Sequence, residues 1–235
     1  KKGSSEMATI PKPKPIALWT NPAKKAIAAR IPSRVRLVST TRATPHHAFL
    51  CQTLQQCLGV LLEWSDSSPN HVPLMVWIEP KEWTWETTDT TTVLDAQGML
   101  EDVEEQINLV WPKEKIITPD DVRGEHQNLS TAVTTSGWPL LDESRGKAIF
   151  VLLGGGDLRE DYHSQFPNLE GATMFTMSVA NTPEAAIFSN TNPVEEGDEI
   201  RALVEAGYIV RSRADSAGNG EADNNETARR DAAIE

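Results

Sequence analysis

Strand-length apolar runs alternate with amphipathic helical segments along most of the chain. The runs at 72–78 (VPLMVWI) and 148–153 (AIFVLL) have the length of strands, whereas 54–62 and 99–110 carry apolar residues at helical spacing. Parallel strands need a long crossover, which is usually a helix, so this order predicts an α/β fold built from parallel βα units. In such folds the loops at the carboxyl ends of the strands hold the functional site.

The stretch LMVWIEPKEW at 74–83 ends an apolar strand with two charges. A strand alternates its faces with period two, so one face carries Met75, Trp77, Glu79 and Lys81. The other face carries Leu74, Val76 and Ile78. Glu79 and Lys81 therefore lie together at the carboxyl end of this strand, where a site is expected.

The same spacing recurs after the strand YIVRSR. Arg211, Arg213 and Asp215 follow one another at period two at the end of that strand. These charges, like Glu79 and Lys81, are candidates for a binding site. Salt bridges at the rim of a sheet are the alternative interpretation, and the residue pattern alone leaves both open.

The local sequence predicts two helix starts. Thr53 with Gln56 three positions later has the pattern of a capping box, and Thr118 followed by Pro119 and two acids is typical of a helix start. Between them, KIIT (115–118) predicts a short strand, and the segment between 153 and 172 that contains Tyr162 and His163 is predicted to be a polar loop. Gly154–Gly156 lacks the Lys and Ser or Thr of a phosphate-binding P-loop and predicts a turn.

Cys51 and Cys57 are the only cysteines, and the sequence leaves their state open. Within one helix, six residues of rise would separate them by roughly 9 Å, which is too far for a disulfide. If the helix begins at Thr53, Cys51 precedes it and can fold back towards Cys57. A disulfide would also need an oxidising compartment.

The net charge argues against nucleic acid as the main partner. It is -12, whereas phosphate backbones attract positive surfaces. No apolar run approaches the ~20 residues needed to span a bilayer, so no transmembrane segment is expected. The initial KKGSSEMATIPKPKP has lysines without a following apolar core, so it is not a complete signal peptide, and we expect that the chain as printed cannot direct its own secretion.

Several motifs in one order resemble the calcium-dependent phosphatidylinositol-specific phospholipase C-like family. They are CQTLQQCLGVLLEWSDSSPNHVPLMVWIEPK, ITPDDVRG, SGWPLLDESRGKAIFVL, VEAGYIVRSRAD and NETARRDAA, from about Cys51 to the end of the chain. The resemblance implies a TIM barrel and a phosphoric diester hydrolase that uses a histidine pair and Ca²⁺, with Mg²⁺ as the other option. It also implies an extracellular or secreted protein that makes peripheral contact with membranes.

The resemblance also suggests roles for individual residues. Glu79 matches a carboxylate that binds the metal, and Lys81 matches a lysine that contacts phosphate. Arg211, Arg213 and Asp215 match a strand end that contacts the phosphate or inositol of a phospholipid head group or a glycerophosphodiester. Oxygen ligands suit Ca²⁺ or Mg²⁺, and cationic side chains offset the charge that grows on a phosphodiester.

The N-terminal part departs from the family pattern. The expected catalytic histidine segments are missing, and LVSTTRA at 37–43 stands where a second histidine should lie, while His46 and His47 come about five residues later. We hypothesise a frameshifted or mis-spliced reading upstream of Cys51, which translation of the parent gene in its other two frames would test. The chain also ends at AAIE, before the last strand of the family.

These departures shape the expected domain and activity. We expect residues 1–34 to be poorly ordered or unrelated to the family, and 35–235 to form a partial barrel of about six strands. The favoured function is cleavage of a phosphoinositide or related glycerophosphodiester. The alternatives are an inactive fragment or pseudoenzyme that only binds phosphorylated head groups, or a structural secreted protein with sequons at Asn128 and Asn225.

Overall fold

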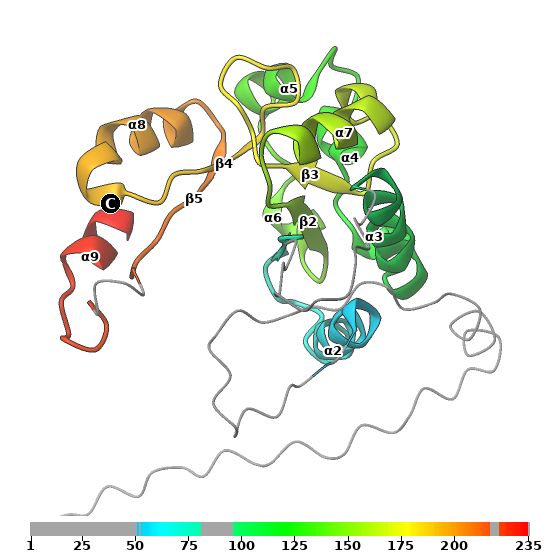
Figure 1. The fold of residues 1–235 in the computed structure, drawn as a ribbon, viewed down its shortest axis with the longest axis horizontal. Helices are drawn as coiled ribbons and strands as arrows, with labels where there is room; N and C mark the ends of the chain where they lie inside the picture. The colour runs from blue at the N-terminus through cyan, green and yellow to red at the C-terminus, as the bar shows by residue number, and fades with distance from the viewer. Residues whose placement is uncertain (1–50, 52, 81–95, 217–220, 235) are drawn as a thin grey trace, which may run out of the picture. The chain divides into compact units, whose positions relative to one another are not determined.

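Strands and helices alternate in the computed structural model, which describes residues 51, 53–80, 96–216 and 221–234 (Figure 1). The strands are β1 (Leu74–Ile78), β2 (Ala148–Leu152), β3 (Met174–Thr176), β4 (Ile187–Ser189) and β5 (Ile209–Arg211). The helices are α2 (Leu54–Ser67), α3 (Ala96–Val110), α4 (Pro119–Arg123), α5 (Leu129–Thr135), α6 (Leu141–Ser144), α7 (Asp157–Gln165), α8 (Pro193–Glu205) and α9 (Ala228–Ile234). Two 3₁₀ turns, η1 (Lys113–Lys115) and η2 (Pro167–Leu169), complete the order.

The strands pair in parallel in both sheets. One sheet has the order β1-β2-β3, and the other pairs β4 with β5. An isolated parallel bridge joins Met177, just after β3, to Ile187 at the start of β4. The prediction of parallel βα units is therefore confirmed. Closure into a barrel is not seen among the described residues, so the incomplete TIM barrel remains a prediction.

Two short elements differ from the sequence prediction. KIIT forms no strand of its own, because only Ile116 makes an isolated bridge to Ala148, next to a hydrogen bond from Ile117 N to Ala148 O (2.8 Å). Conversely, the sequence analysis did not predict β4. Its three residues are too few to show a period, and they become a strand through their pairing with β5.

The core packs helices against one face of the three-stranded sheet. All five residues of β2 are buried. Trp111, directly after α3, lies edge-on to the Phe150 ring (5.6 Å between centroids) and donates from Nε1 to Leu58 O of α2 (3.1 Å). Fully burying a side chain of this size contributes about 1.5–3 kcal/mol. β1 and β3 thus pair with a central strand that is completely buried.

A buried carboxylate ties α3 and α7 to the start of β3. Glu104 of α3 accepts hydrogen bonds from Thr173 N (3.1 Å), Met174 N (3.2 Å) and the hydroxyl of Tyr162. Burial, together with this carboxylate, raises the pKa of Tyr162 well above its ordinary value, so the phenol stays protonated and donates. These contacts satisfy a charge that would be costly to bury alone.

The prediction of a polar loop around Tyr162 and His163 is wrong. These residues belong to α7, and Tyr162 is completely buried. The helix offers only two apolar side chains with i,i+4 spacing, Leu158 and Tyr162, so its sequence pattern is weak. Its position depends on tertiary contacts such as the one with Glu104. The predicted turn at Gly154–Gly156 is confirmed, with Gly156 as the N-cap of α7 at φ 55°.

The start of α2 resolves the open question about the cysteines. Thr53 is the N-cap, and its Oγ1 accepts a hydrogen bond from Gln56 N (3.2 Å). Cys51 precedes the helix and forms a disulfide with Cys57, with 5.1 Å between the Cα atoms. This separation is ordinary for a disulfide. Thr118 likewise caps α4, in a complete capping box with Asp121.

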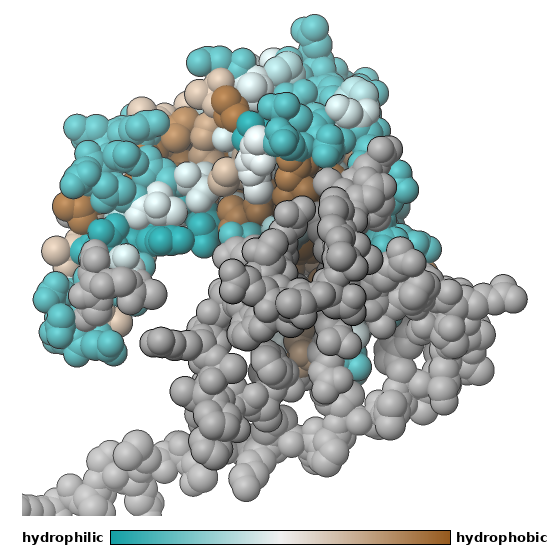
Figure 2. All heavy atoms as spheres, viewed as in Figure 1, coloured by the Kyte–Doolittle hydropathy of each residue, from teal (hydrophilic) through white to brown (hydrophobic). Residues whose placement is uncertain are grey.

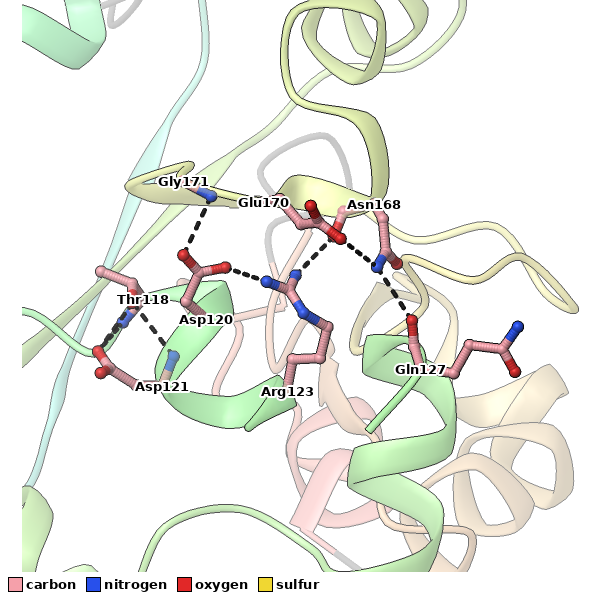
Figure 3. Close-up of polar contacts among 8 residues, drawn as sticks. All are labelled: Thr118, Asp120, Asp121, Arg123, Gln127, Asn168, Glu170 and Gly171. Carbon is pink, nitrogen blue, oxygen red and sulfur yellow. Dashed lines mark hydrogen bonds and ion pairs between the residues drawn. The ribbon is translucent and has the colours of Figure 1, made fainter. Parts of the chain in front are cut away.

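Contacts from α4 hold the turn that leads into β3 (Figure 3). Arg123 forms an ion pair with Asp120 and donates from Nη1 to Asn168 O (2.8 Å), while Asp120 accepts from Gly171 N (3.0 Å). Asn168 and Leu169 both have left-handed φ values, 56° and 53°. Two consecutive residues in this region are unusual for side chains other than glycine. The polar contacts from α4 stabilise this conformation.

In the view of Figure 2, hydrophilic residues (teal) lie around the edges of the described part, and patches of apolar residues (brown) lie toward its middle. None of the described helices is long and apolar enough to cross a membrane.

Candidate functional site

The candidate site begins on the face of the sheet opposite Phe150. Residues in parallel register share a face, so Trp77 of β1 lies on the same face as Val151 of β2 and Phe175 of β3. Strand alternation continues this face to Glu79, which is exposed directly after β1. The carboxylate therefore stands at the carboxyl end of β1, as the sequence predicts.

Arg211 of β5 contacts this same face. Its guanidinium carbon lies 5.2 Å from the centroid of the Trp77 ring, a cation–π contact between the two sheets. Its Nη1 donates to Ser189 Oγ of β4 (3.2 Å), the residue with which Arg211 is in register. Arg211 and Trp77 are both half-buried. A fixed positive charge thus lies near the carboxyl ends of β1, β4 and β5.

Sequence reasoning missed two members of this arrangement. It placed Trp77 on the face of Glu79 but gave no partner for the ring, because the contact with Arg211 depends on tertiary structure. Ser189 lies in β4, which the sequence analysis did not predict. Period-two alternation was the sequence pattern that could have identified Trp77 as a member of this arrangement. No local pattern identified Ser189.

The other predicted site residues do not join Arg211 in the described contacts. Arg213 and Asp215 are exposed after β5, and Asp215 Oδ1 accepts from Ala222 N at 3.4 Å, a contact within its own loop. Lys81 lies outside the described residues. Of the five predicted residues, Glu79 and Arg211 are the two that the structure places at the carboxyl ends of strands facing the Trp77 side of the sheet.

A charged brace supports the loop that follows β5. Arg229 of α9 forms an ion pair with Glu221 (2.8 Å), with only 16% and 13% of the two side chains exposed. Glu221 also accepts from Ser216 N (2.6 Å), and Arg229 donates to Thr191 O (3.1 Å), which lies after β4. The brace therefore connects the loops at the carboxyl ends of β4 and β5.

The described histidines lie away from this face. His163 Nε2 bonds Thr176 Oγ1 (2.9 Å), and Thr176 shares the helix-covered face with Phe150 and Met174 by register. Burial lowers the pKa of His163. His71 bonds Ser65, and His126 bonds Ser136. His46 and His47 lie outside the described residues.

The described residues supply part of a metal site at most. Glu79 offers hard carboxylate oxygens, the ligand type that Ca²⁺ takes. Within the described ranges, however, no group of three or more His, Cys, Asp or Glu side chains could hold a metal ion. Ca²⁺ needs six to eight oxygen ligands, so these residues alone do not fit the ion.

A cavity of about 380 Å³ lies at the other end of the strands. Its lining includes Lys113, Ile116 and Lys147, and Ile116 bridges to the first residue of β2. Catalysis in parallel α/β folds takes place at the carboxyl ends. We therefore place the candidate site at Glu79 and Arg211 rather than in this cavity.

Comparison with known proteins agrees with the fold and the predicted family. The family described as phosphoinositide phospholipase C, Ca²⁺-dependent, matches residues 46–235. A search of curated proteins finds no match.

Solved structures resemble the described fold. A Ca²⁺-dependent phosphatidylinositol-specific phospholipase C from Streptomyces antibioticus is 19% identical with a TM-score of 0.54, covering 68% of this chain and 58% of its own. A calcium-dependent phosphoinositol-specific phospholipase C from Pseudomonas sp., in apo form and myo-inositol complex, is 17% identical with a TM-score of 0.52, covering 75% and 64%. The chain thus spans about three-fifths of the length of these structures.

Proposed function

Since the chain belongs to the Ca²⁺-dependent phosphoinositide phospholipase C family, we propose that it acts on a phosphodiester. The reaction is hydrolysis of a phosphoinositide or a related glycerophosphodiester with the help of a divalent cation. The substrate approaches the carboxyl ends of the strands, where Glu79 and Arg211 lie. We further propose that residues 35–235 form a partial TIM barrel and that residues 1–34 are a separate segment.

The held guanidinium of Arg211 is the observation that carries this proposal. A phosphodiester is anionic, and charge grows on its oxygens as the bond to the leaving alcohol breaks. Among the described residues, Ser189 is the one acceptor for Arg211, so further N–H groups of the guanidinium can meet phosphate oxygens. Arginine suits this task because its planar fork donates two parallel hydrogen bonds to phosphate.

Glu79 is proposed as one ligand of the cation. A divalent ion would supply Lewis-acid stabilisation of the phosphate charge. The remaining ligands must come from outside the described residues or from the substrate. Lys81, Arg213 and Asp215 remain proposed contacts for the phosphate or the inositol ring.

Hydrolysis of phosphatidylinositol vesicles tests this function directly. We expect the chain to release inositol phosphate with Ca²⁺, and a chelator to stop the release. Glu79→Gln should reduce the rate by about 10- to 100-fold if its carboxylate binds the cation, whereas Glu101→Gln, an exposed glutamate on α3, should leave it unchanged. A rate that is the same in chelator and in Ca²⁺ would contradict the metal requirement.

Binding without turnover is the second candidate function. No described histidine lies on the face of Trp77, so the acid-base pair expected of the family is not among the described residues. If vesicles are bound but not hydrolysed, and Arg211→Leu weakens binding, the chain is a binder of phosphorylated head groups. The disulfide between Cys51 and Cys57 favours an oxidising compartment, which supports the proposal that the protein is secreted.

A further inference from the structure

We propose that Trp77 and Ser189 are positioning residues that hold Arg211 ready to bind a phosphate-bearing head group. The inference rests on the proposed function, because it assigns a purpose to the charge that the function requires. Three strands contribute: Trp77 from β1, Ser189 from β4 and Arg211 from β5. Neither Trp77 nor Ser189 needs to touch the ligand itself.

The geometry limits the guanidinium from two directions. The Trp77 ring lies 5.2 Å from Cζ, and Ser189 Oγ accepts from Nη1 at 3.2 Å. A free arginine side chain samples many rotamers, and ordering it on binding costs affinity. A side chain already stacked and hydrogen-bonded loses less freedom when the ligand arrives. Among the described residues Arg211 forms no ion pair with a carboxylate, which would compete with an anionic ligand.

The parallel register explains why these three residues meet. Ser189 and Arg211 are register partners on β4 and β5, so the hydroxyl and the guanidinium stem share a face. Trp77 lies on the face of β1 that leads to Glu79. The cation–π contact therefore holds the guanidinium beside the strand that leads to Glu79.

The first experiment follows Arg211 without any ligand. In ¹⁵N-labelled protein, the Trp77 ring current should shift the Arg211 Nε–H proton signal, and this shift should vanish in Trp77→Leu and persist in Trp77→Phe. Thermal unfolding of each variant confirms that it folds. An Arg211 signal that is identical in wild type and Trp77→Leu would overturn the positioning role, whether or not the protein is an enzyme.

The second experiment measures binding of myo-inositol 1-phosphate by calorimetry, with inorganic phosphate as a parallel ligand. We expect Trp77→Leu to weaken binding about 10-fold, and Ser189→Ala and Trp77→Phe about 2- to 5-fold. Ser212→Ala is the control for Ser189→Ala, because Ser212 directly follows Arg211 and strand alternation places it on the opposite face. Equal affinity for both ligands would assign the site to free phosphate rather than to a head group.

A double-mutant cycle separates positioning from general stability. In the Arg211→Leu background, Trp77→Leu should weaken binding no further, because the group that it positions is gone. Additive losses would show that Trp77 acts independently of Arg211 and would overturn the proposal. If wild type binds neither ligand and hydrolyses no lipid, the proposed function fails. Binding by wild type that is unchanged in Trp77→Leu would defeat only the positioning role.

Discussion

The β1-β2-β3 sheet and the β4-β5 pair are built on different physical grounds. The first has a completely buried central strand and a carboxylate network under it, whereas all three residues of β5 are only half-buried and α9 has no buried residue. Around the second sheet, Val194, Val204 and Ile234 are 57%, 54% and 76% exposed. Apolar burial stabilises the first region and reaches β4, where Ile187 and Phe188 are buried, whereas polar contacts such as Arg229–Glu221 hold the loop after β5.

This difference matters because the two regions contribute different halves of the proposed site. Glu79 extends from the sheet with the completely buried central strand, whereas Arg211 lies on β5, the half-buried strand of the second pair. Regions with few buried apolar contacts open locally at a lower free energy than the core does. The contact between Trp77 and Arg211 therefore couples a rigid element to a more mobile one.

Removing the Phe150 ring should have the largest effect. Phe150→Ala leaves a cavity beneath Trp111 in the central strand, and we expect the free energy of unfolding to fall by about 3–5 kcal/mol. Urea denaturation followed by circular dichroism measures the change. Leu140→Ala, at a side chain that is 69% exposed, is the control and should stay within about 0.5 kcal/mol. A loss below about 1 kcal/mol for Phe150→Ala would refute the contrast between the regions.

Removing one hydroxyl should come next. Tyr162→Phe deletes the hydrogen bond to the buried Glu104 carboxylate, and bonds to charged groups contribute about 1.5–3 kcal/mol. Tyr208→Phe is the matched control in the second region. Among the described residues its hydroxyl bonds the neutral Ser130 (2.8 Å), and its loss should cost about 0.5–1.5 kcal/mol. Equal losses from the two substitutions, measured in the same urea titration, would argue against a special role for Glu104.

Breaking the ion pair between Arg229 and Glu221 should have a smaller effect on stability, and the effect should be limited to the region around β5. Arg229→Gln removes an ion pair that is largely shielded from water, and we expect about 1–2 kcal/mol less protection of the β5 amides in hydrogen exchange. Arg230→Gln, one residue further along α9, breaks an exposed pair with Asp231 that water screens, and it should leave the protection of the β5 amides unchanged. The β2 amides should exchange at the wild-type rate in both variants, and a shared change in β2 and β5 would mean that the regions unfold together.

Acidification should have the smallest effect, through His163. Burial lowers its folded-state pKa, so below the unfolded value of about 6.5 the unfolded chain binds more protons than the folded one. The stability of wild type should fall as the pH drops through that value, until His163 is also protonated in the folded state. His163→Asn should give a flatter profile in urea titrations at several pH values. A variant profile as steep as that of wild type would assign the pH dependence to other groups.

The sequence predicted what depends on neighbours along the chain. Thr53 and Thr118 marked helix starts because a cap is a local hydrogen bond, and strand alternation placed Glu79 at the end of β1. It failed for Tyr162, whose burial follows from Glu104, a residue on a different helix. The disulfide stayed open at the sequence level because it depends on where α2 begins.

The site itself was predictable only in part, for the same reason. Arg211 stood out by its charge at a strand end, but its partners Trp77 and Ser189 come from two other strands and are brought together only by the tertiary fold. Arg213 and Asp215 had the same spacing along the chain, yet both are exposed, and Asp215 bonds within its own loop. Period-two spacing gives the direction of a side chain, and the twist and ending of the strand decide what it reaches.

The parallel pairing of β1 with β2 also has a consequence for how the chain is made. Leu74 finds its partner in Ala148, which leaves the ribosome only after α3, α4, α5 and α6. During synthesis the backbone groups of β1 that pair with β2 therefore stay unpaired until β2 is made, and pairings between such distant residues form slowly. Folding of the first sheet should thus depend on when β2 appears, and a ribosome paused before residue 148 would present an unpaired apolar strand to chaperones.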